Sequence, residues 1–268
     1  MRARLRRWAL LGFLGLFILF LYGPTFTILL LSFQGPDGGL TFPMNGVSLH
    51  WFVRLFQQQA VGDFGGAMQR SLALATMVTV ATVSISLSAG LAFRRGFRGA
   101  DWLFTLTVAS LIVPSILISL GIGLLFNQSG LDPTWYGSAF GAQLTWTLPF
   151  GLLIMFAVFN RFDRSLEEAA RDLGASPAQS LRFVLLPLIT PSLIGIALFG
   201  FTLSYDEFAR TLLTAGSDNT LPLEIYGMTT NVTTPVLYAL GTVTTGVSFV
   251  AIGLGLWAMR ALSRRPAR

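Results

Sequence analysis

Two groups of charged residues interrupt an otherwise apolar sequence, and they are the side chains best suited to chemistry. The first lies in SLEEAARDLGASPAQSLRFVLLP, from Ser165 to Pro187, which holds two glutamates, one aspartate and two arginines. The second is the pair Asp206 and Glu207, followed by Arg210. Carboxylates act as general acids or bases, bind cations, or form ion pairs. The elements that carry them decide which of these roles applies.

The residue types that the sequence lacks exclude several classes of enzyme. There is no cysteine, every basic residue other than His50 is arginine, and His50 is the single histidine. A thiol nucleophile, a disulfide, a cysteine metal site, a Schiff-base lysine and a P-loop lysine are therefore excluded. No pair of carboxylates stands in a plausible catalytic arrangement either. We expect no catalytic residue, no metal site and no ATP site within this chain.

The composition indicates an integral membrane protein. Hydrophobic residues make up 53% of the 268 residues and charged residues only 11%, against about 25% charged residues in soluble domains. A membrane-spanning helix needs about 20 mostly apolar residues. The sequence predicts one all-α transmembrane domain over residues 1–268, with the first span retained rather than cleaved as a signal peptide. Its six predicted spans are residues 8–33, 71–93, 102–126, 139–159, 188–213 and 235–259.

The arginines predict how these spans are oriented. All but three of the 18 arginines lie before the first span, after the last, or in the loops after the second and fourth spans. Because basic residues accumulate on the cytoplasmic side, both termini and loop 160–187 are expected in the cytoplasm, and loop 34–70 outside. The positive charge is thus a topology signal, and nucleic-acid binding is not expected.

Residues within and beside the spans are candidates for a transport pathway. Asp206 and Glu207 lie about 27 Å into the fifth predicted span, near the edge of the hydrocarbon layer, where ionisable side chains are candidates for function. They attract a cationic substrate, or they form a gate or docking position; alternatively, Asp206 and Arg210 form a helix-surface ion pair at i,i+4 spacing. Prolines beside polar or aromatic residues indicate helix kinks that line a pathway. The pathway candidates are Pro114, Ser115, Trp146, Tyr205, Asp206 and Glu207.

The charged stretch has the local signals of two short helices joined by a glycine turn. Ser165 with Glu168, and Ser176 with Gln179, have the spacing of capping boxes. Gly174 lies where a glycine ends a helix, and Glu167 is spaced to pair with Arg171. The first helix is too short and polar to cross a membrane, and its small apolar stripe suits a groove on another protein; a solvated amphipathic loop is the alternative. This stripe consists of Leu166, Ala169, Ala170 and Leu173.

The same stretch resembles the EAA loop of binding-protein-dependent ABC importer permeases of the type I, MetI-like class. The resemblance covers residue types, spacing, cytoplasmic position and placement before the fifth span. The segments YGPTFTILLLSF and FTLSYDEFARTLLTAGSDNTLPLEIYGM are similar to the PotC-type spermidine/putrescine branch of that family. The matching positions of the EAA loop are Glu168, Ala169, Ala170, Gly174, Leu186 and Pro187.

This resemblance implies a fold, partners and a mechanism. The chain would be a type I ABC importer transmembrane domain in the bacterial inner membrane, paired with a second permease subunit of different sequence. A cytoplasmic ATPase dimer would bind ATP and magnesium, so this chain would hold no cofactor and would not be an enzyme. A periplasmic binding protein would deliver substrate, and the pathway would open alternately to each side. The implied contacts with the ATPase are Glu167, Glu168, Ala169, Ala170, Arg171 and Gly174.

The substrate expected from this branch is a polyamine, spermidine or putrescine. Another small charged solute, such as an aminophosphonate or an amino-acid-like compound, is the alternative within the same class. An ion-coupled secondary transporter is the alternative from another class. It would need charges at mid-depth in the spans and an inverted repeat, and the sequence shows no convincing example of either.

Overall fold

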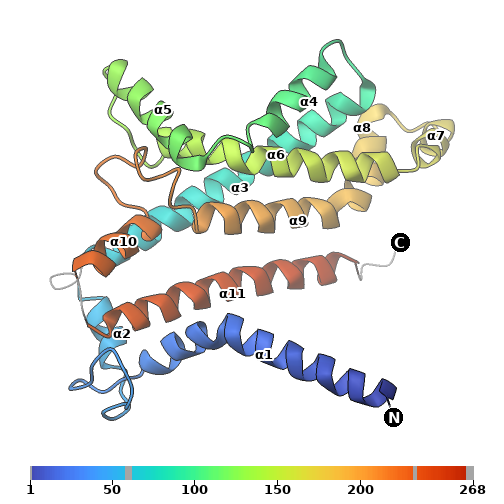
Figure 1. The fold of residues 1–268 in the computed structure, drawn as a ribbon. Coiled ribbons are helices and arrows are strands. Elements are labelled where there is room, and N and C mark those ends of the chain that lie inside the picture. The colour runs from blue at the N-terminus through green and yellow to red at the C-terminus, as the bar shows by residue number, and fades with distance from the viewer. Residues whose placement is uncertain (1, 58–61, 232–233, 264–268) are drawn as a thin grey trace. The chain divides into compact units, whose positions relative to one another are not determined.

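The long apolar segments form helices in the computed structural model, which describes residues 2–57, 62–231 and 234–263 (Figure 1). Within this described part, the β-type pairing is a single antiparallel bridge between Gln34 and Val47. The expected all-α class is therefore confirmed. The elements are α1 (Arg2–Leu31), α2 (His50–Leu55), α3 (Phe64–Arg95), α4 (Ala100–Ala109), α5 (Ser115–Gln128), α6 (Ser138–Arg161), α7 (Ser165–Asp172), α8 (Pro177–Ser180), η1 (Leu181–Leu185), α9 (Leu186–Tyr205), α10 (Leu221–Asn231) and α11 (Val236–Ser263).

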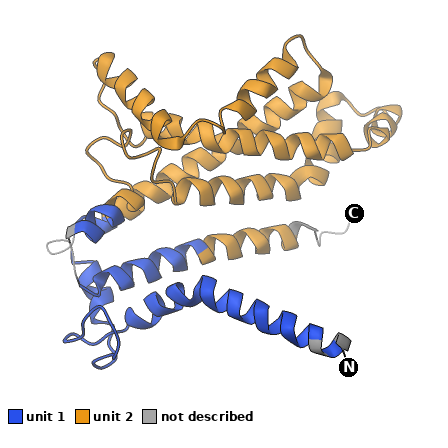
Figure 2. Ribbon diagram, viewed as in Figure 1, with its two compact units in different colours: residues 1–65, 225–248 blue, residues 66–224, 249–268 orange. Residues whose placement is uncertain are grey.

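The chain divides into two compact units (Figure 2). The first unit comprises residues 1–65 and 225–248 and contains α1, α2 and the loop between them. The buried side chain of Gln34 organises that loop, because its amide nitrogen donates to the Gly39 carbonyl at 3.1 Å and its oxygen accepts from the Asn45 amide at 2.8 Å. Trp51, on the short helix α2, donates from its indole nitrogen to the Gly35 carbonyl at 3.2 Å.

The second unit comprises residues 66–224 and 249–268 and carries the candidate sites. Helix α6 packs against α9, α5 and α4. One part of its core consists of Met155, Leu185, Ile189 and Ile196, and another of Leu74, Val78 and Ala139. Small residues bring α3 and α6 together, since a Cβ atom added at Gly151 would lie 2.2 Å from the Ser86 hydroxyl and one added at Gly90 would lie 2.8 Å from the Phe159 ring. The small-residue spacing of Ser86 and Gly90 thus marks a close helix contact.

The third predicted span, residues 102–126, is not a single helix. It is divided into α4 and α5 by the segment from Ser110 to Pro114, because proline at the start of α5 lacks the amide hydrogen that a continuous helix needs. Five helical stretches in the described residues are long and apolar enough to cross a membrane, and α4 and α5 are shorter apolar helices. The count of six spans and the cytoplasmic placement of the termini remain predictions.

The fifth predicted span, residues 188–213, has different bounds in the structure. Residues Pro177–Tyr205 form one long helical stretch of α8, η1 and α9, so the helix starts inside the predicted cytoplasmic loop 160–187. It ends at Tyr205, and residues 206–220 form turns. The side chain of Arg210, which local helix formation would leave on a helix surface, is instead completely buried. The contacts of the Arg210 side chain with α5 and α6 therefore outweigh local helix propensity in this segment.

Candidate functional site

The first candidate site is the loop that carries α7, and its start differs from the prediction. Ser165 does not cap α7, because it is the first helical residue and the flanking residue Arg164 makes no side-chain cap. The cap comes from Asp163, whose Oδ1 accepts a hydrogen bond from the Ser165 amide at 2.9 Å. This amide, assisted by the Ser165 hydroxyl, lowers the pKa of Asp163 below its ordinary value of 3.8. A carboxylate satisfies an unpaired helix amide as well as a serine does, so serine spacing alone did not locate the cap.

The glycine turn after α7 forms as expected. Gly174 has a positive φ of 86°, and its amide donates to the Arg171 carbonyl at 2.8 Å, while the Ala175 amide donates to the Ala170 carbonyl at 3.0 Å. This pair of bonds is a Schellman motif, which requires a left-handed residue that glycine adopts without steric cost. The predicted capping box of α8 is also present, with Ser176 and Gln179 bonded to each other's amides.

The predicted apolar stripe of α7 is largely uncovered by this chain. Leu166 is 45% exposed and Leu173 is 90% exposed, and Ala169 is exposed as well. A leucine side chain gains about 1.5–3 kcal/mol when it leaves water. Helix α7 therefore presents small and apolar side chains that no other described residue covers.

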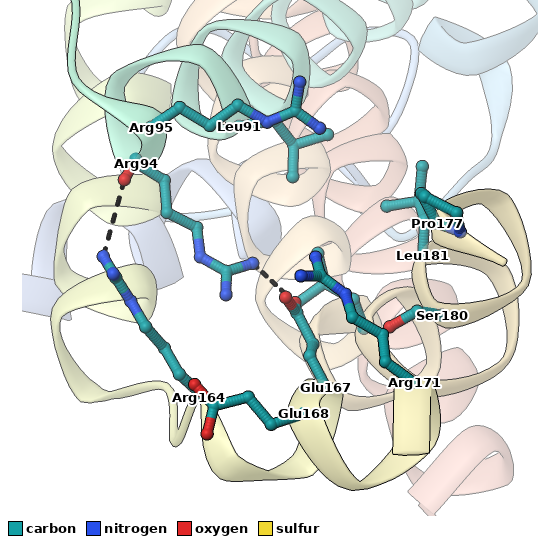
Figure 3. A pocket seen from close by; sticks show the side chains of 11 residues that line it. Leu91, Arg94, Arg95, Arg164, Glu167, Glu168, Arg171, Pro177, Ser180 and Leu181 are labelled. Carbon is teal, nitrogen blue, oxygen red and sulfur yellow. Dashed lines mark hydrogen bonds and ion pairs between the residues drawn. The ribbon is translucent and has the colours of Figure 1, made fainter. Parts of the chain in front are cut away.

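The charged side of α7 contacts α3 instead of pairing within the helix. Glu167 Oε1 lies 2.6 Å from Arg94 Nη1, and both side chains are largely buried. The predicted pair of Glu167 with Arg171 is thus replaced, within the described residues, by an ion pair across 73 residues. Figure 3 shows Arg94, Glu167, Glu168 and Arg171 extending around one pocket. Local spacing could not predict this pairing, because the end of α3 and the start of α7 meet only in the folded chain.

The second candidate site lies where α9 ends. Trp146 of α6 and the acidic pair Asp206 and Glu207 line one pocket of about 320 Å³. The remaining lining residues are Phe199, Thr202 and Leu203. The structure thus brings together three of the six predicted pathway residues, from segments 60 residues apart. We call this cavity the carboxylate pocket.

Arg210 contacts Trp146 in the wall of this pocket and was not predicted as a site residue. It is completely buried; its Nη1 donates to the Thr145 hydroxyl at 3.1 Å and its Nε to the Ser115 hydroxyl at 3.4 Å. Its guanidinium lies 4.8 Å from the centre of the Trp146 ring, a cation–π distance. Glu207 Oε1 accepts from the Arg210 backbone amide at 2.9 Å. The helix-surface ion pair of Asp206 with Arg210 is therefore wrong, because α9 ends before both residues.

The other predicted pathway residues lie apart from the carboxylate pocket. Pro114 flanks the start of α5, and Ser115 reaches the site through its bond to Arg210. Tyr205 is 2% exposed, stacks on Phe201 with ring centres 5.9 Å apart and lies 3.4 Å from the Met68 sulfur, so it belongs to the protein interior. The signal that sequence analysis missed was Arg210 itself, an arginine outside the basic clusters and three positions before the end of the predicted span at Leu213.

Comparison with known proteins identifies the family of this helical chain. Residues 82–268 match the family described as binding-protein-dependent transport system inner membrane component. The chain belongs to this family. It is therefore a multi-pass membrane component of a transport system, and the resemblance to importer permeases is confirmed.

Individual relatives agree with this assignment. The spermidine/putrescine transport system permease protein PotC of Escherichia coli (strain K12) is 29% identical, and the match covers 90% of each chain. The putrescine transport system permease protein PotI of the same strain is 28% identical, over 92% of this chain and 88% of its own. A solved bacterial alginate ABC transporter, in complex with alginate pentasaccharide-bound periplasmic protein, has a chain with the same fold at a TM-score of 0.66 and 17% identity. That match covers 98% of this chain and 95% of the solved one.

Proposed function

We propose that this chain is one permease subunit of an ATP-driven importer of polyamines in the bacterial inner membrane. A second permease subunit completes the pathway, a cytoplasmic ATPase dimer hydrolyses ATP, and a periplasmic binding protein delivers the substrate. Both termini and α7 lie on the cytoplasmic side, as the arginine distribution indicates. The names of the two relatives support a polyamine as the substrate.

The single observation that carries this proposal is the composition of the carboxylate pocket. A polyamine presents ammonium groups separated by alkyl segments. Carboxylates neutralise an ammonium group, and an aromatic face attracts it by about 0.5–2 kcal/mol. Asp206, Glu207 and Trp146 supply both kinds of group, and Phe199 and Leu203 supply apolar wall for the alkyl segments. Arg210 does not line the pocket, so its side chain does not fill the space beside the two carboxylates.

Uptake of radiolabelled spermidine by cells that express the complete transport system tests this role. The double variant Asp206→Asn with Glu207→Gln removes both charges with little change in volume, and we expect at least a tenfold fall in uptake. Asp218→Asn is the matched control, because Asp218 is an exposed carboxylate of the same segment outside the pocket. Equal uptake by the double variant and the control would refute the proposed pathway role.

The exposed stripe of α7 supports the docking of the ATPase. A groove that receives α7 needs close approach at Ala169 and an intact turn at Gly174, whereas membrane insertion depends on the apolar spans. We therefore expect Ala169→Arg or Gly174→Pro to abolish transport while the chain is still inserted, and Ala169→Ser to retain it because serine remains small. Copurification of the ATPase at normal yield, together with normal transport in Ala169→Arg, would contradict this docking.

A further inference from the structure

A pocket between the end of α3 and the helices α7, α8 and η1 carries an unbalanced positive charge. It has a volume of about 390 Å³, and four arginines and two glutamates line it (Figure 3). We call it the basic pocket. Its charged lining residues are Arg94, Arg95, Arg164, Arg171, Glu167 and Glu168.

The internal contacts of the basic pocket leave part of this charge available. Arg94 is engaged by Glu167 and by the rings of Phe159 and Phe162, whose centres lie 5.5 and 5.1 Å from its guanidinium. Arg164 donates to the Arg94 carbonyl at 3.4 Å, a contact that leaves its charge uncompensated. The two remaining arginines add further positive charge to the exposed rim. An anion that enters the pocket therefore meets guanidinium groups, whose planar donors match phosphate oxygens.

A buried hydroxyl without a partner lies in the same pocket. Ser180 is 3% exposed, and its Oγ forms no hydrogen bond within the described residues. Figure 3 shows this hydroxyl on the side of Ser180 that faces the arginines. An unsatisfied buried hydroxyl is unfavourable, whereas a ligand oxygen would satisfy it. The chain widens into the π-helix η1 directly after Ser180, a local distortion that is frequent at functional sites.

The remaining wall of the basic pocket is apolar. Leu91, Leu181 and Leu185 line it together with Pro177, so one cavity joins arginine donors to hydrocarbon. A free phosphate ion would use the arginines and leave this wall without a partner. A phospholipid uses both, since its phosphate binds the arginines and its glycerol and upper acyl chain contact the leucines. The position at the final turn of a membrane-spanning helix, where Arg94 and Arg95 end α3, is also where a headgroup lies.

We infer that the basic pocket binds the phosphate headgroup of an anionic phospholipid and thereby ties the α7 loop to the end of α3. The lipid supplies the negative charge that the two glutamates do not provide. It would also stabilise the position of α7, because residues of α3, α7, α8 and η1 would all contact one molecule. This site differs from the stripe of α7, whose exposed leucines do not line the pocket, and it does not depend on the identity of the transported substrate.

Native mass spectrometry of the full-length chain in detergent tests the inference. The chain is titrated with phosphatidylglycerol, which carries one negative charge, and with phosphatidylcholine, which carries no net charge. We expect one saturable phosphatidylglycerol site and only weak, unsaturated phosphatidylcholine binding. Because one arginine near an anionic lipid surface contributes about 1 kcal/mol, Arg95→Gln and Arg171→Gln should each weaken binding about fivefold. Ser180→Ala should also weaken it, because the hydroxyl donor is lost.

Arg98→Gln is the matched control, since Arg98 lies three residues after Arg95, is exposed and does not line the pocket. We expect it to leave phosphatidylglycerol binding within about twofold of the unmodified chain. All variants are compared at equal monodispersity, so that a folding defect is recognised. Equal weakening by Arg98→Gln, or equal binding of the two lipids, would overturn the inference. Displacement of bound phosphatidylglycerol by inorganic phosphate at low millimolar concentration would overturn the assignment to a lipid, because it would show that phosphate alone fills the site.

Discussion

Two glycines of α5 provide a matched pair that tests how the segment after α9 is held. A Cβ atom added at Gly123 would lie 2.5 Å from the Leu213 carbonyl oxygen, whereas one added at Gly121 meets nothing within 4 Å. Beside this contact, the Ser119 hydroxyl accepts from the Leu213 amide at 3.0 Å. Carbon and oxygen atoms in such contacts stay about 3.3–3.6 Å apart. Gly123→Ala must therefore move the Leu213 backbone by about 1 Å. This movement would take the Leu213 amide beyond hydrogen-bond distance of the Ser119 hydroxyl.

The cost of Gly123→Ala follows from these distances. Overpacking costs about 1–3 kcal/mol, and the loss of the part-buried hydrogen bond from the Leu213 amide costs about 0.5–1.5 kcal/mol more. Alanine returns at most about 1 kcal/mol through its higher helix propensity. The expected net loss is about 0.5–4.5 kcal/mol. Gly121→Ala changes the same residue type in the same helix and gains only the propensity contribution, so it should be neutral or slightly stabilising.

Thermal unfolding of the full-length chain in detergent, monitored by the fluorescence of its 6 tryptophans, measures the difference in stability between the two variants. A loss of about 3 kcal/mol corresponds to a fall in Tm of about 6–12 °C for a unit near this size. Gly123→Ala should also lower spermidine uptake, because Leu213 follows the segment that carries Asp206, Glu207 and Arg210. A Tm for Gly123→Ala equal to that of Gly121→Ala would refute the close packing of α5 against this segment.

Three further predictions concern the α7 loop. Gly174→Ala should reduce transport-coupled ATPase activity, because the left-handed conformation costs alanine about 1–2 kcal/mol although its Cβ has free space, and Gly174→Asn should reduce it less; the opposite order would contradict this reasoning. Arg94→Gln should lower the Tm of the chain by more than Arg98→Gln, because only Arg94 forms a largely buried ion pair with α7; equal shifts would argue against a stabilising pair. The Asp163 carboxylate, whose folded-state pKa is lowered, stabilises α7 fully above its ordinary pKa of 3.8, and this contribution is lost as pH falls through the lower folded-state value. Asp163→Asn should therefore flatten the decrease of Tm with acid in this range, and an unchanged pH profile would contradict the cap.

Features that depend on neighbouring residues were predicted well from sequence. The turn at Gly174 and the capping box at Ser176 require only residues within a few positions of each other, and both form as expected. The long apolar runs likewise became helices, because a sustained excess of apolar side chains needs no particular partner to favour a helix in lipid. The cap of α7 failed in detail, since Ser165 and Asp163 are both good caps and local spacing does not rank them.

Features that depend on distant residues were not predicted. Local spacing predicted an ion pair of Glu167 with Arg171 and an ion pair of Asp206 with Arg210. Neither pair forms within the described residues. Glu167 pairs instead with Arg94 of α3. The side chain of Arg210 instead contacts residues of α5 and α6. Isolated helix-surface pairs contribute only about 0.2–0.5 kcal/mol, so tertiary packing readily replaces them.

The sequence by itself determined that this chain is a helical membrane protein, that it lacks the lysine of a P-loop, and that a capped, charged loop with an exposed stripe precedes α9. These conclusions rest on composition and on short-range spacing, which folding does not alter. Only the tertiary structure decided that α9 ends at Tyr205 and that Trp146 joins the two carboxylates in one pocket. The physical reason is the buried guanidinium of Arg210, whose partners come from α5 and α6 and are brought within its reach only by helix packing.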